Sequence, residues 1–480
     1  MNSKKLMYLV SIMLMLFFIV DTNAQIGKLK DKLKNTKLKT KTVTKEKTTS
    51  NNSQTSSNNK QSSNDAGLTG KIWYVSKTTG KNKNAGTKDA PLKNIDKAIK
   101  MAQVGDEIYI AGGKYMGTFN IGYLESDKPL RLYGSWDANF TKQDIVNHPT
   151  LFQPDNASGG KSRKALLRFT KNVENTMIDG IVWDSGDRNL YDTKKGIVEG
   201  VEGGLMRLPT EPLPGFNSTV GEPLISFRSA TRGGNITVQN CVFVNGASFA
   251  LQAGLFTGTF KVLNNVFVAN KMAAVEIYGT CAGSNQKANM VACGEVEVAH
   301  NTILFTWSRL KDYLDMGYGV RIMTKLKYNI HHNIIGANIM GGIDNSRFCK
   351  DEFVKIDNNI LFGNKGGDLY YTPASNTKLQ LTADQFEDLE FESVSNNDGT
   401  APAIPVNQAY LKAFFAARYK ETTNYNPNST QNQWARALGM NQQGTMTSSA
   451  TMFMNKYPWK EALKLFGGSA KAGAQKPASK

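Results

Sequence analysis

The segment FKVLNNVFVAN at residues 260–270 returns at residues 354–364 as VKIDNNILFGN. In each copy apolar and polar residues alternate, a polar pair interrupts the alternation, and apolar residues then resume. Alternation is typical of a strand with one buried face, and a polar pair between two such runs is typical of a tight bend. Each copy therefore predicts two short strands joined by a sharp turn.

Three further segments align with these two, and a fourth, TMIDGIVWDSG at 176–186, fits more loosely. The three are ITVQNCVFVNG (236–246), VEVAHNTILFT (296–306) and KYNIHHNIIGAN (327–338). The second members of the polar pairs are Cys241, Asn265, Asn301, Asn333 and Asn359, which are separated by 24, 36, 32 and 26 residues. Such spacings indicate stacked coils with inserted loops. An amide at one corner of every coil would donate to one neighbour and accept from the other, so we expect an asparagine ladder.

The chain resembles the right-handed parallel β-helix, or pectin lyase-like, superfamily. The corner repeat carries part of the resemblance, and the segment IWYVSKTTGKNKNAGTKDAPLKNIDKAIKMAQVGDEIYIAGGKYMGTFNI at 72–121 carries the rest. The resemblance covers about residues 72–371 and implies an all-β solenoid of secreted type, with a short N-terminal helix. The fold alone does not fix an activity, because it hosts lyases, hydrolases, esterases, epimerases and non-catalytic adhesins.

The short helix can also be predicted from its own residues. Asn94 is a suitable N-cap and Gly105 a suitable stop. The apolar residues that fall on one side are Leu92, Ile95, Ile99 and Ala102. We expect this helix to cover the open end of the solenoid, as a capping unit must.

The N-terminus predicts export. Lys4 and Lys5 precede an apolar run from Leu6 to Val20, and DTNAQ follows. This is the pattern of a signal peptide over residues 1–24, and the run is shorter than the ~20 residues that span a bilayer. We expect an extracytoplasmic protein in the periplasm, on the outer membrane or secreted. No transmembrane span should remain after cleavage, and no nucleic-acid partner is expected.

Composition divides the rest of the chain. Residues 25–70 hold ten lysines among Thr, Ser and Asn, and predict a disordered tether. Its charge would attract an anionic envelope surface, or serve only to solvate a spacer. We expect the β-helix over residues 71–400, a helical segment packed on it over 401–467, and a disordered tail over 468–480.

The cysteines fall into three groups. Cys281 and Cys293 lie in one polar insertion, GTCAGSNQKANMVACGE, and predict a local disulfide in an oxidising compartment. Metal ligands are lacking near them, so no metal is assigned there. Cys241 sits in a strand pattern as a small buried residue, and Cys349 has no assigned role.

Counting 11 residues on from four corner positions gives Gln252, Glu276, Asp344 and Tyr370, each preceded by an apolar residue. The apolar residues should point inward and the polar ones outward. Arg321 joins the same column, because Val320 and Ile322 should point inward. The predicted column therefore reads Gln252, Glu276, Arg321, Asp344 and Tyr370, one residue per coil.

Three interpretations of this column stand. The resemblance implies a lyase in which Arg321 is the base and Glu276 and Asp344 hold Ca²⁺, although a free guanidinium has a pKa above ~12. A glycosidase would use the two carboxylates, about 10 Å apart for strands spaced ~4.8 Å. The third interpretation is structural: opposite charges pair across neighbouring strands. The paired-Asp and Gly-His-Gly motifs of polygalacturonases are absent.

Insertions at 187–220, 278–295 and 308–316 interrupt the repeat and are expected to form a binding wall. Trp307 and Tyr318, near the third insertion, would stack on sugar rings or cover the edge of a coil. The sequence therefore predicts an exported β-helix that binds, and in one interpretation cleaves, a polymeric acidic polysaccharide. The alternative is a non-catalytic surface or envelope protein that uses the β-helix as a rigid scaffold.

Overall fold

The protein is described here from a computed structural model. It describes residues 70–115, 124–153, 165–171, 173–186, 201–202, 205–207, 222–227, 233–246, 248–279, 292–306, 316–323, 325–338, 340–346, 349–364, 367–373, 379–411, 419–420, 445–446, 451–453 and 456–479. The predicted signal peptide and almost all of the predicted tether lie outside these residues. In the described ranges, no helix has both the length and the apolar character needed to span a membrane.

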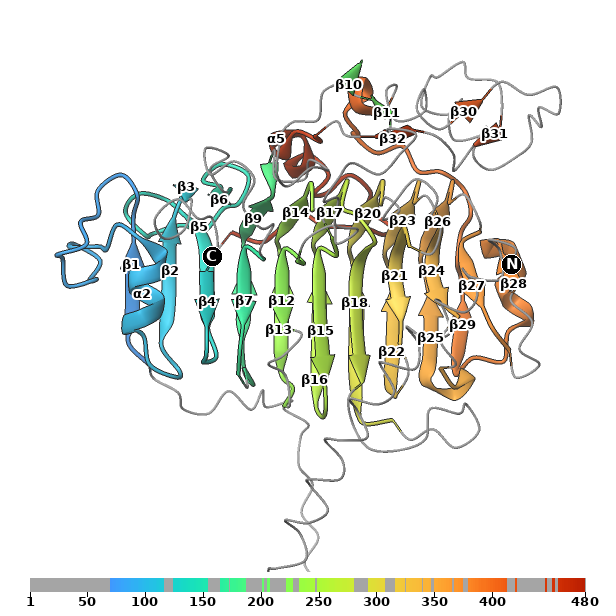
Figure 1. Ribbon diagram of the computed structural model, residues 1–480, viewed down its shortest axis with the longest axis horizontal. Helices are drawn as coiled ribbons and strands as arrows, with labels where there is room; N and C mark the ends of the chain where they lie inside the picture. Colours follow the sequence, from blue (N-terminus) through green and yellow to red (C-terminus); the bar gives the residue numbers. More distant parts are fainter. Residues whose placement is uncertain are drawn as a thin grey trace, which may run out of the picture. The chain divides into compact units, whose positions relative to one another are not determined.

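Most strands belong to three long sheets that run side by side (Figure 1). Sheet A comprises β1 (Ile72–Val75), β2 (Glu107–Ala111), β5 (Arg131–Trp136), β8 (Met177–Asp179), β13 (Ile236–Gln239), β16 (Thr259–Leu263), β19 (Gly294–Ala299), β22 (Leu326–His331), β25 (Val354–Asp357) and β29 (Ser393–Ser395). Sheet B comprises β3 (Gly113–Tyr115), β6 (Thr150–Phe152), β9 (Ile181–Asp184), β14 (Val242–Val244), β17 (Val266–Val268), β20 (Thr302–Leu304), β23 (Ile334–Gly336) and β26 (Ile360–Phe362). Sheet C comprises β4 (Leu124–Ser126), β7 (Leu167–Phe169), β12 (Ile225–Phe227), β15 (Leu251–Leu255), β18 (Ala273–Gly279), β21 (Tyr318–Ile322), β24 (Gly341–Asn345), β27 (Leu369–Tyr371) and the antiparallel β28 (Leu379–Leu381).

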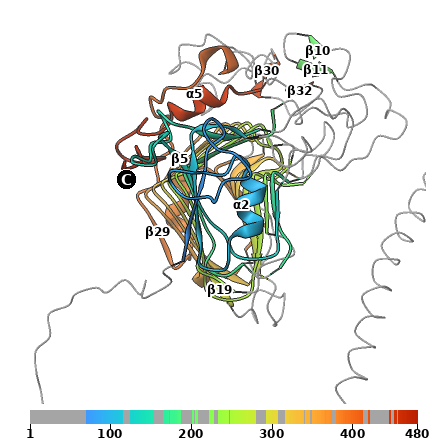
Figure 2. The same ribbon diagram turned by 90° about the vertical axis from the view of Figure 1, so that its left-hand side faces the viewer.

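Each coil gives one strand to each sheet in turn, as β16, β17 and β18 do before β19, β20 and β21. Equivalent strands of successive coils pair in parallel, without a shift in register between β16 and β19 or between β19 and β22. The chain is a right-handed parallel β-helix. The view along the coils shows the strands of each sheet stacked behind one another (Figure 2).

Stacked apolar residues fill the space between the sheets. Val262, Val298 and Ile330 are partners in the register of sheet A, and each is fully buried. Phe243 and Phe267 of sheet B lie with their rings stacked, with centroids 4.7 Å apart. Burying a side chain of this kind stabilises the fold by about 1.5–3 kcal/mol. The core is therefore a set of ladders, each one residue wide, and it follows from the repeat.

The asparagine ladder is confirmed at the corner between sheets A and B. The backbone N–H of Asn265 donates to Oδ1 of Asn301 at 2.9 Å. The same bond links Asn301 to Asn333 at 2.9 Å and Asn333 to Asn359 at 3.0 Å. Asn397, which the repeat alignment missed, continues the ladder with a bond of 3.1 Å from Asn359. The four predicted asparagines are fully buried.

The predicted bend is also confirmed, because the first residue of each polar pair has a left-handed backbone. These residues are Asn240, Asn264, His300, His332 and Asn358, with φ between 51° and 57°. Asparagine tolerates this conformation better than most residues, which explains its place in the pair. The two residues of the pair thus have separate tasks: the first makes the bend and the second makes the ladder.

A second ladder, which sequence reasoning missed, lies at the corner between sheets B and C. The backbone N–H of Gly246 donates to Oδ1 of Asn270 at 2.9 Å, and that of Thr306 donates to Asn338 at 3.0 Å. Asn338 donates in turn to Asn364 at 3.1 Å. These residues are the last letters of the repeated phrases, so the signal was present in the alignment.

The N-terminal helix is α2 (Ile95–Met101), at the end of the solenoid where β1 lies (Figure 1). Its predicted apolar side is buried, and the helix contacts β1, β2 and β4. The predicted boundaries need correction. Asn94 is the N-cap but its side chain makes no capping bond, and the helix ends at Met101 rather than at Gly105.

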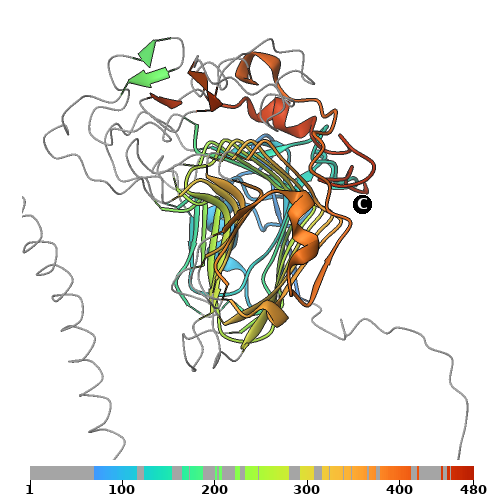
Figure 3. The same cartoon turned by 90° about the vertical axis from the view of Figure 1, so that its right-hand side faces the viewer.

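The C-terminal region was predicted to be helical, and its described residues hold both a helix and short strands. Within its described residues it holds the helix α5 (Trp459–Leu463) and the short strands β30 (Tyr419–Lys420), β31 (Thr445–Met446) and β32 (Thr451–Phe453). Strand β32 pairs with β11 (Leu205–Arg207), which lies inside the first predicted insertion and also pairs with β10 (Val201–Glu202). Helix α5 contacts β14 and β17 of sheet B. In the view of Figure 3 this helix lies above the coils.

The tail predicted to be disordered is instead bound to the solenoid through residue 479. The backbone N–H of Gly473 donates to the carbonyl of His332 at 2.8 Å, and that of Ala474 donates to Oγ1 of Thr302 at 2.9 Å. Gln475 and the side chain of Asn264 exchange two bonds of 2.6 and 3.0 Å. Small residues let this segment lie close to the corner of the coils.

Two of the cysteines, Cys241 and Cys349, are buried and form no disulfide. Cys241 is fully buried at the first rung of the ladder, as expected of a small core residue. Its backbone N–H donates to Oδ1 of Asn265 at 2.9 Å. Cys281 lies outside the described residues, so its disulfide with Cys293 stays a prediction.

Candidate functional site

The predicted column exists as a row of register partners across sheet C. Gln252 pairs with Glu276, Glu276 with Arg321, Arg321 with Asp344, and Asp344 with Tyr370. Their neighbours Leu251, Val275, Val320, Ile343 and Leu369 belong to the core between the sheets. The row therefore lies on the outer face, as predicted. It is not exposed, however, because these five residues are only 1–8% accessible.

Ion pairs hold the centre of this row together. Arg321 Nη1 contacts Glu276 Oε2, and Arg321 Nε donates to Asp344 Oδ2 at 2.9 Å. Gln252 Nε2 donates to the other oxygen of Glu276. The backbone N–H of Ser346 donates to Asp344 Oδ1 at 3.1 Å. Each of the four carboxylate oxygens thus has a donor, and a Ca²⁺ ion would have to displace some of them.

The surroundings of Arg321 favour its charged form. Burial lowers the pKa of the guanidinium, but the carboxylates of Glu276 and Asp344 more than offset this, so the pKa lies above its ordinary value. A base must give up its proton near neutral pH to act on a sugar ring. The geometry therefore matches the structural interpretation of the column more closely than the role of Arg321 as a base, which stays a prediction.

Tyr318, predicted to stack on sugar rings, instead contacts Tyr370, the last residue of the column. The rings of Tyr318 and Tyr370 lie edge to face, with centroids 5.3 Å apart. Both residues are buried, and burial raises the pKa of Tyr370 to about 12, with a further contribution from Asp344. Trp307 lies outside the described residues. As described, neither tyrosine presents an open ring face to a sugar.

The row extends further than the sequence predicted. Gln252 pairs with Ser226, Ser226 with Arg168, and Arg168 with Glu125, so three more coils contribute polar residues. Arg168 also lies 3.6 Å from Glu222 in an ion pair. These coils lack the paired asparagine, and without that marker their register could not be counted.

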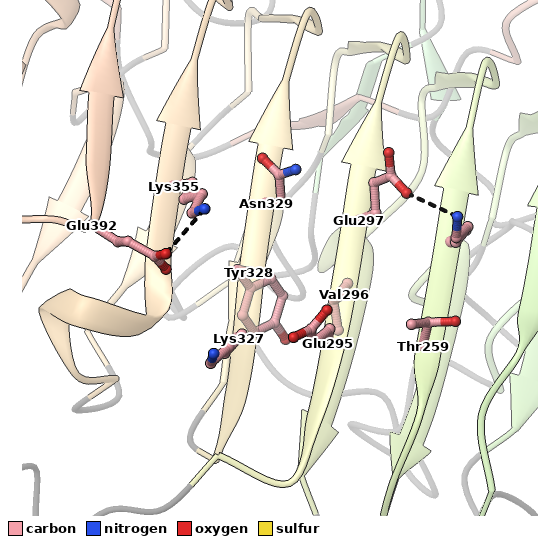
Figure 4. Close-up of a pocket in the computed structure, with 10 residues that line it drawn as sticks. Thr259, Glu295, Val296, Glu297, Lys327, Tyr328, Asn329, Lys355 and Glu392 are labelled. Atoms are coloured by element: carbon pink, nitrogen blue, oxygen red, sulfur yellow. Dashed lines mark ion pairs between the residues drawn. The ribbon is translucent and has the colours of Figure 1, made fainter. Parts of the chain in front are cut away.

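A second site, which sequence reasoning missed, is an open groove of about 290 Å³ on the outer face of sheet A (Figure 4). It crosses β16, β19, β22 and β25, and residue 392 closes one end. The residues that line it are Thr259, Lys261, Glu295, Val296, Glu297, Lys327, Tyr328, Asn329, Lys355 and Glu392. Its polar side chains come from these four strands and from Glu392, directly before β29 on the next coil.

The polar groove residues form rows, as the column residues do, but they remain accessible, whereas Val296 and Tyr328 belong to the core. Lys261, Glu297 and Asn329 are register partners. Lys261 Nζ lies 3.5 Å from Glu297 Oε2, with side chains 45% and 32% exposed. Lys355 Nζ lies 3.0 Å from Glu392 Oε1, and both of these side chains are 41% exposed. Figure 4 shows both ion pairs on the face of the strands.

The sequence carried a signal for this groove. Lys261, Glu297, Asn329 and Lys355 each lie four residues before a ladder asparagine, in the alternating part of the repeated phrase. Strand alternation already placed them on the outer face. What the sequence could not show is that these residues stay accessible while Glu276, Arg321 and Asp344 are buried.

The comparisons with known proteins are distant. A family described as a protein of unknown function, DUF1565, matches residues 78–120. Among curated proteins, none matches the chain. A structure of XylC in complex with xylose is 11% identical, with a TM-score of 0.28 over 62% of this chain and 63% of that one. A structure of pectate lyase Pel9A is 13% identical, with a TM-score of 0.29 over 62% of this chain and 72% of that one. The matched part thus spans less than two thirds of the XylC chain.

Proposed function

We propose that this protein binds a polysaccharide in the groove over β16, β19, β22 and β25. The observation that carries this proposal is the repetition of accessible polar side chains in the same rows of four successive coils. The buried column of sheet C has the same periodicity, but its charges are already paired. The groove is therefore the better candidate for contact with a large ligand.

The chemistry of the groove suits a polymer of hydroxyl-bearing rings. A hydroxyl both donates and accepts, and the groove offers ammonium donors, carboxylate acceptors and the amide of Asn329. Strands spaced ~4.8 Å apart carry these groups over about 14 Å along the stack. Glu295 and Lys327 are exposed register partners that form no ion pair within the described part of the chain. Both remain available to a ligand.

We propose an exported protein and an anionic glycan. The chain carries a formal charge of +18, which attracts anionic polymers at long range. Within the groove itself, the charges of three lysines and three glutamates cancel. Local contacts should therefore be made mainly with the hydroxyl groups of the glycan rather than with its charged groups. Neutral and acidic glycans should therefore differ mainly in the dependence of binding on salt.

The second candidate function is cleavage of the glycan by Glu276, Arg321 and Asp344. The fold brings these three groups together on successive coils, but the contacts of the guanidinium with both carboxylates keep it charged. Access to a polymer would require these buried groups to become exposed. The alternative of a non-catalytic scaffold needs no bound glycan at all.

One experiment distinguishes glycan binding in the groove, cleavage by the column and a non-catalytic scaffold. The purified full chain is titrated with a panel of uronic-acid polymers and neutral glycans, with and without Ca²⁺, and then tested for unsaturated products and new reducing ends. Lys327→Ala/Asn329→Ala should weaken binding about tenfold, as expected when a few hydrogen bonds are lost. The matched control is Lys142→Ala/Asn139→Ala, on the exposed loop after β5.

The outcomes are distinct. Binding that falls only in the groove variant, without products, supports the proposal. Products that disappear in Arg321→Met, in a folded protein, support catalysis by the column. Absence of binding across the panel supports the function as a non-catalytic scaffold and contradicts the proposal.

A further inference from the structure

Three of the four histidines in the chain meet at one corner of the solenoid. His300 follows β19, while His331 ends β22 on the next coil and His332 follows it. One ligand nitrogen from each lies within 4.8 Å of the others. The remaining histidine, His148, is elsewhere. The stacking of two coils thus assembles a cluster that no single segment contains.

At this corner, histidines replace the asparagines that other coils use for the bend. His300 and His332 occupy the bend position that Asn240, Asn264 and Asn358 fill in other coils, with φ of 55° and 53°. The buried ladder asparagines behind them are unchanged, so the fold does not require imidazole at these positions. His331 adds a third imidazole directly before the bend.

The distances between the rings suit a shared ion. Nδ1 of His331 lies 3.0 Å from Nδ1 of His332, and these rings are nearly perpendicular, at 87°. Two nitrogens bound at ~2.0–2.1 Å to one tetrahedral Zn²⁺ would lie about 3.3 Å apart. The ring of His300 stacks on that of His332, with centroids 4.9 Å apart. Small side-chain rotations would therefore bring the three nitrogens to one point.

Two further observations point to a ligand. Nδ1 of His300 is buried and has no hydrogen-bond partner. Such an atom costs stability unless something satisfies it. Nε2 of His331 lies 3.4 Å from Oε1 of Glu297. A carboxylate at Nε2 holds the proton there and leaves the Nδ1 lone pair directed at the cluster, as carboxylates do behind metal-binding histidines.

We propose that His300, His331 and His332 bind a divalent transition-metal ion, with Zn²⁺ as the first candidate. Imidazole suits Zn²⁺, Cu²⁺ and Ni²⁺, whereas Ca²⁺ and Mg²⁺ require oxygen ligands. Three protein ligands leave one position of a tetrahedral ion for water. The site lies beside the docked tail, because the carbonyl of His332 accepts from Gly473.

The test uses the full chain with no polyhistidine tag, freed of metal with EDTA and titrated with ZnCl₂ in a calorimeter. We expect one ion per chain. Binding of Co²⁺ should give the visible absorption of a tetrahedral site, which does not depend on any activity. The decisive variants are His300→Asn and His332→Asn, because asparagine already occupies this bend in adjacent coils and should preserve the fold.

Each of these variants should bind Zn²⁺ at least about tenfold more weakly, and Glu297→Gln about 10–100-fold more weakly. His148→Ala is the matched control and should bind as the wild type does. Wild-type protein that binds no Zn²⁺, or His300→Asn and His332→Asn variants that bind it unchanged, would overturn the proposal.

Discussion

At the scale of single residues, the molecule depends on buried polar groups that are fully paired. Asn301 accepts from the backbone and side chain of Asn265, and its own amide donates to the carbonyl of Val262. Asn301→Ala would leave these buried groups without partners. We expect a loss of at least about 2 kcal/mol in the free energy of unfolding, measured with urea. Asn329→Ala on the groove face, the control, should cost less than ~0.5 kcal/mol.

Arg321 tests whether the column of sheet C is structural. Arg321→Met would strand two buried carboxylates and should cost about 3–5 kcal/mol. The triple variant Glu276→Gln/Arg321→Met/Asp344→Asn removes all three charges and should recover most of that loss. Urea unfolding of both variants measures the difference. Equal stability of the single variant and the wild type would show that the ion pairs do not hold the coils together.

Asp368 should make stability depend on pH. It closes the second ladder, where Asn364 Nδ2 donates to its Oδ1 at 2.8 Å. Burial raises the pKa of this carboxyl to about 7, from about 3.9 in the unfolded chain. Between these pH values only the folded state holds the proton on Asp368. The protonated carboxyl therefore contributes its full stabilisation at low pH, and this stabilisation is lost as the pH rises through about 7.

The measurement is urea unfolding at pH about 5 and about 8. We expect the wild type to lose more stability between these two pH values than Asp368→Asn does, because the amide does not titrate. An equal pH dependence in the two proteins would contradict the assignment.

At the scale of elements, the repeat predicted the strands, the bend and the first ladder. It did so because each corner asparagine marks the register, and alternation then sets which side chains face outward. The groove residues followed the same rule. The burial of Glu276, Arg321 and Asp344 could not be predicted from this rule, because burial depends on contacts outside the strand itself.

The tail shows the other limit of sequence reasoning. Its Gly-, Ala- and Lys-rich composition lacks the apolar content of a folded element, which is why the sequence predicts disorder. It is instead held by hydrogen bonds to side chains at the corners of the coils. Those partners, Asn264 and Thr302, are distant in sequence and carry no mark of this role.

Asn264→Ala therefore tests the docking of the tail. The variant removes both bonds to Gln475, so we expect faster hydrogen exchange at the amides of residues 473–475. The control is Asn358→Ala, which has the same left-handed backbone, with φ of 57°, but lies at a different coil. Rapid exchange of these amides in the wild-type protein would show that the tail is not bound.

At the scale of the whole molecule, one repeat produces two faces with different properties. On the face of sheet C, Glu276, Arg321 and Asp344 pair their charges with one another and are buried. The face of sheet A leaves Glu295 and Lys327 exposed beside two exposed ion pairs. Because both faces follow the same register, the accessibility of sheet A is what makes it the candidate for binding a polymer.

The most direct test is a crystal structure of the full chain with an oligosaccharide cut from the glycan that it binds most tightly. Our account predicts sugar rings along sheet A, in hydrogen-bond contact with Lys327 and Asn329. Sugar found instead against Tyr318 and Tyr370 on sheet C would contradict it.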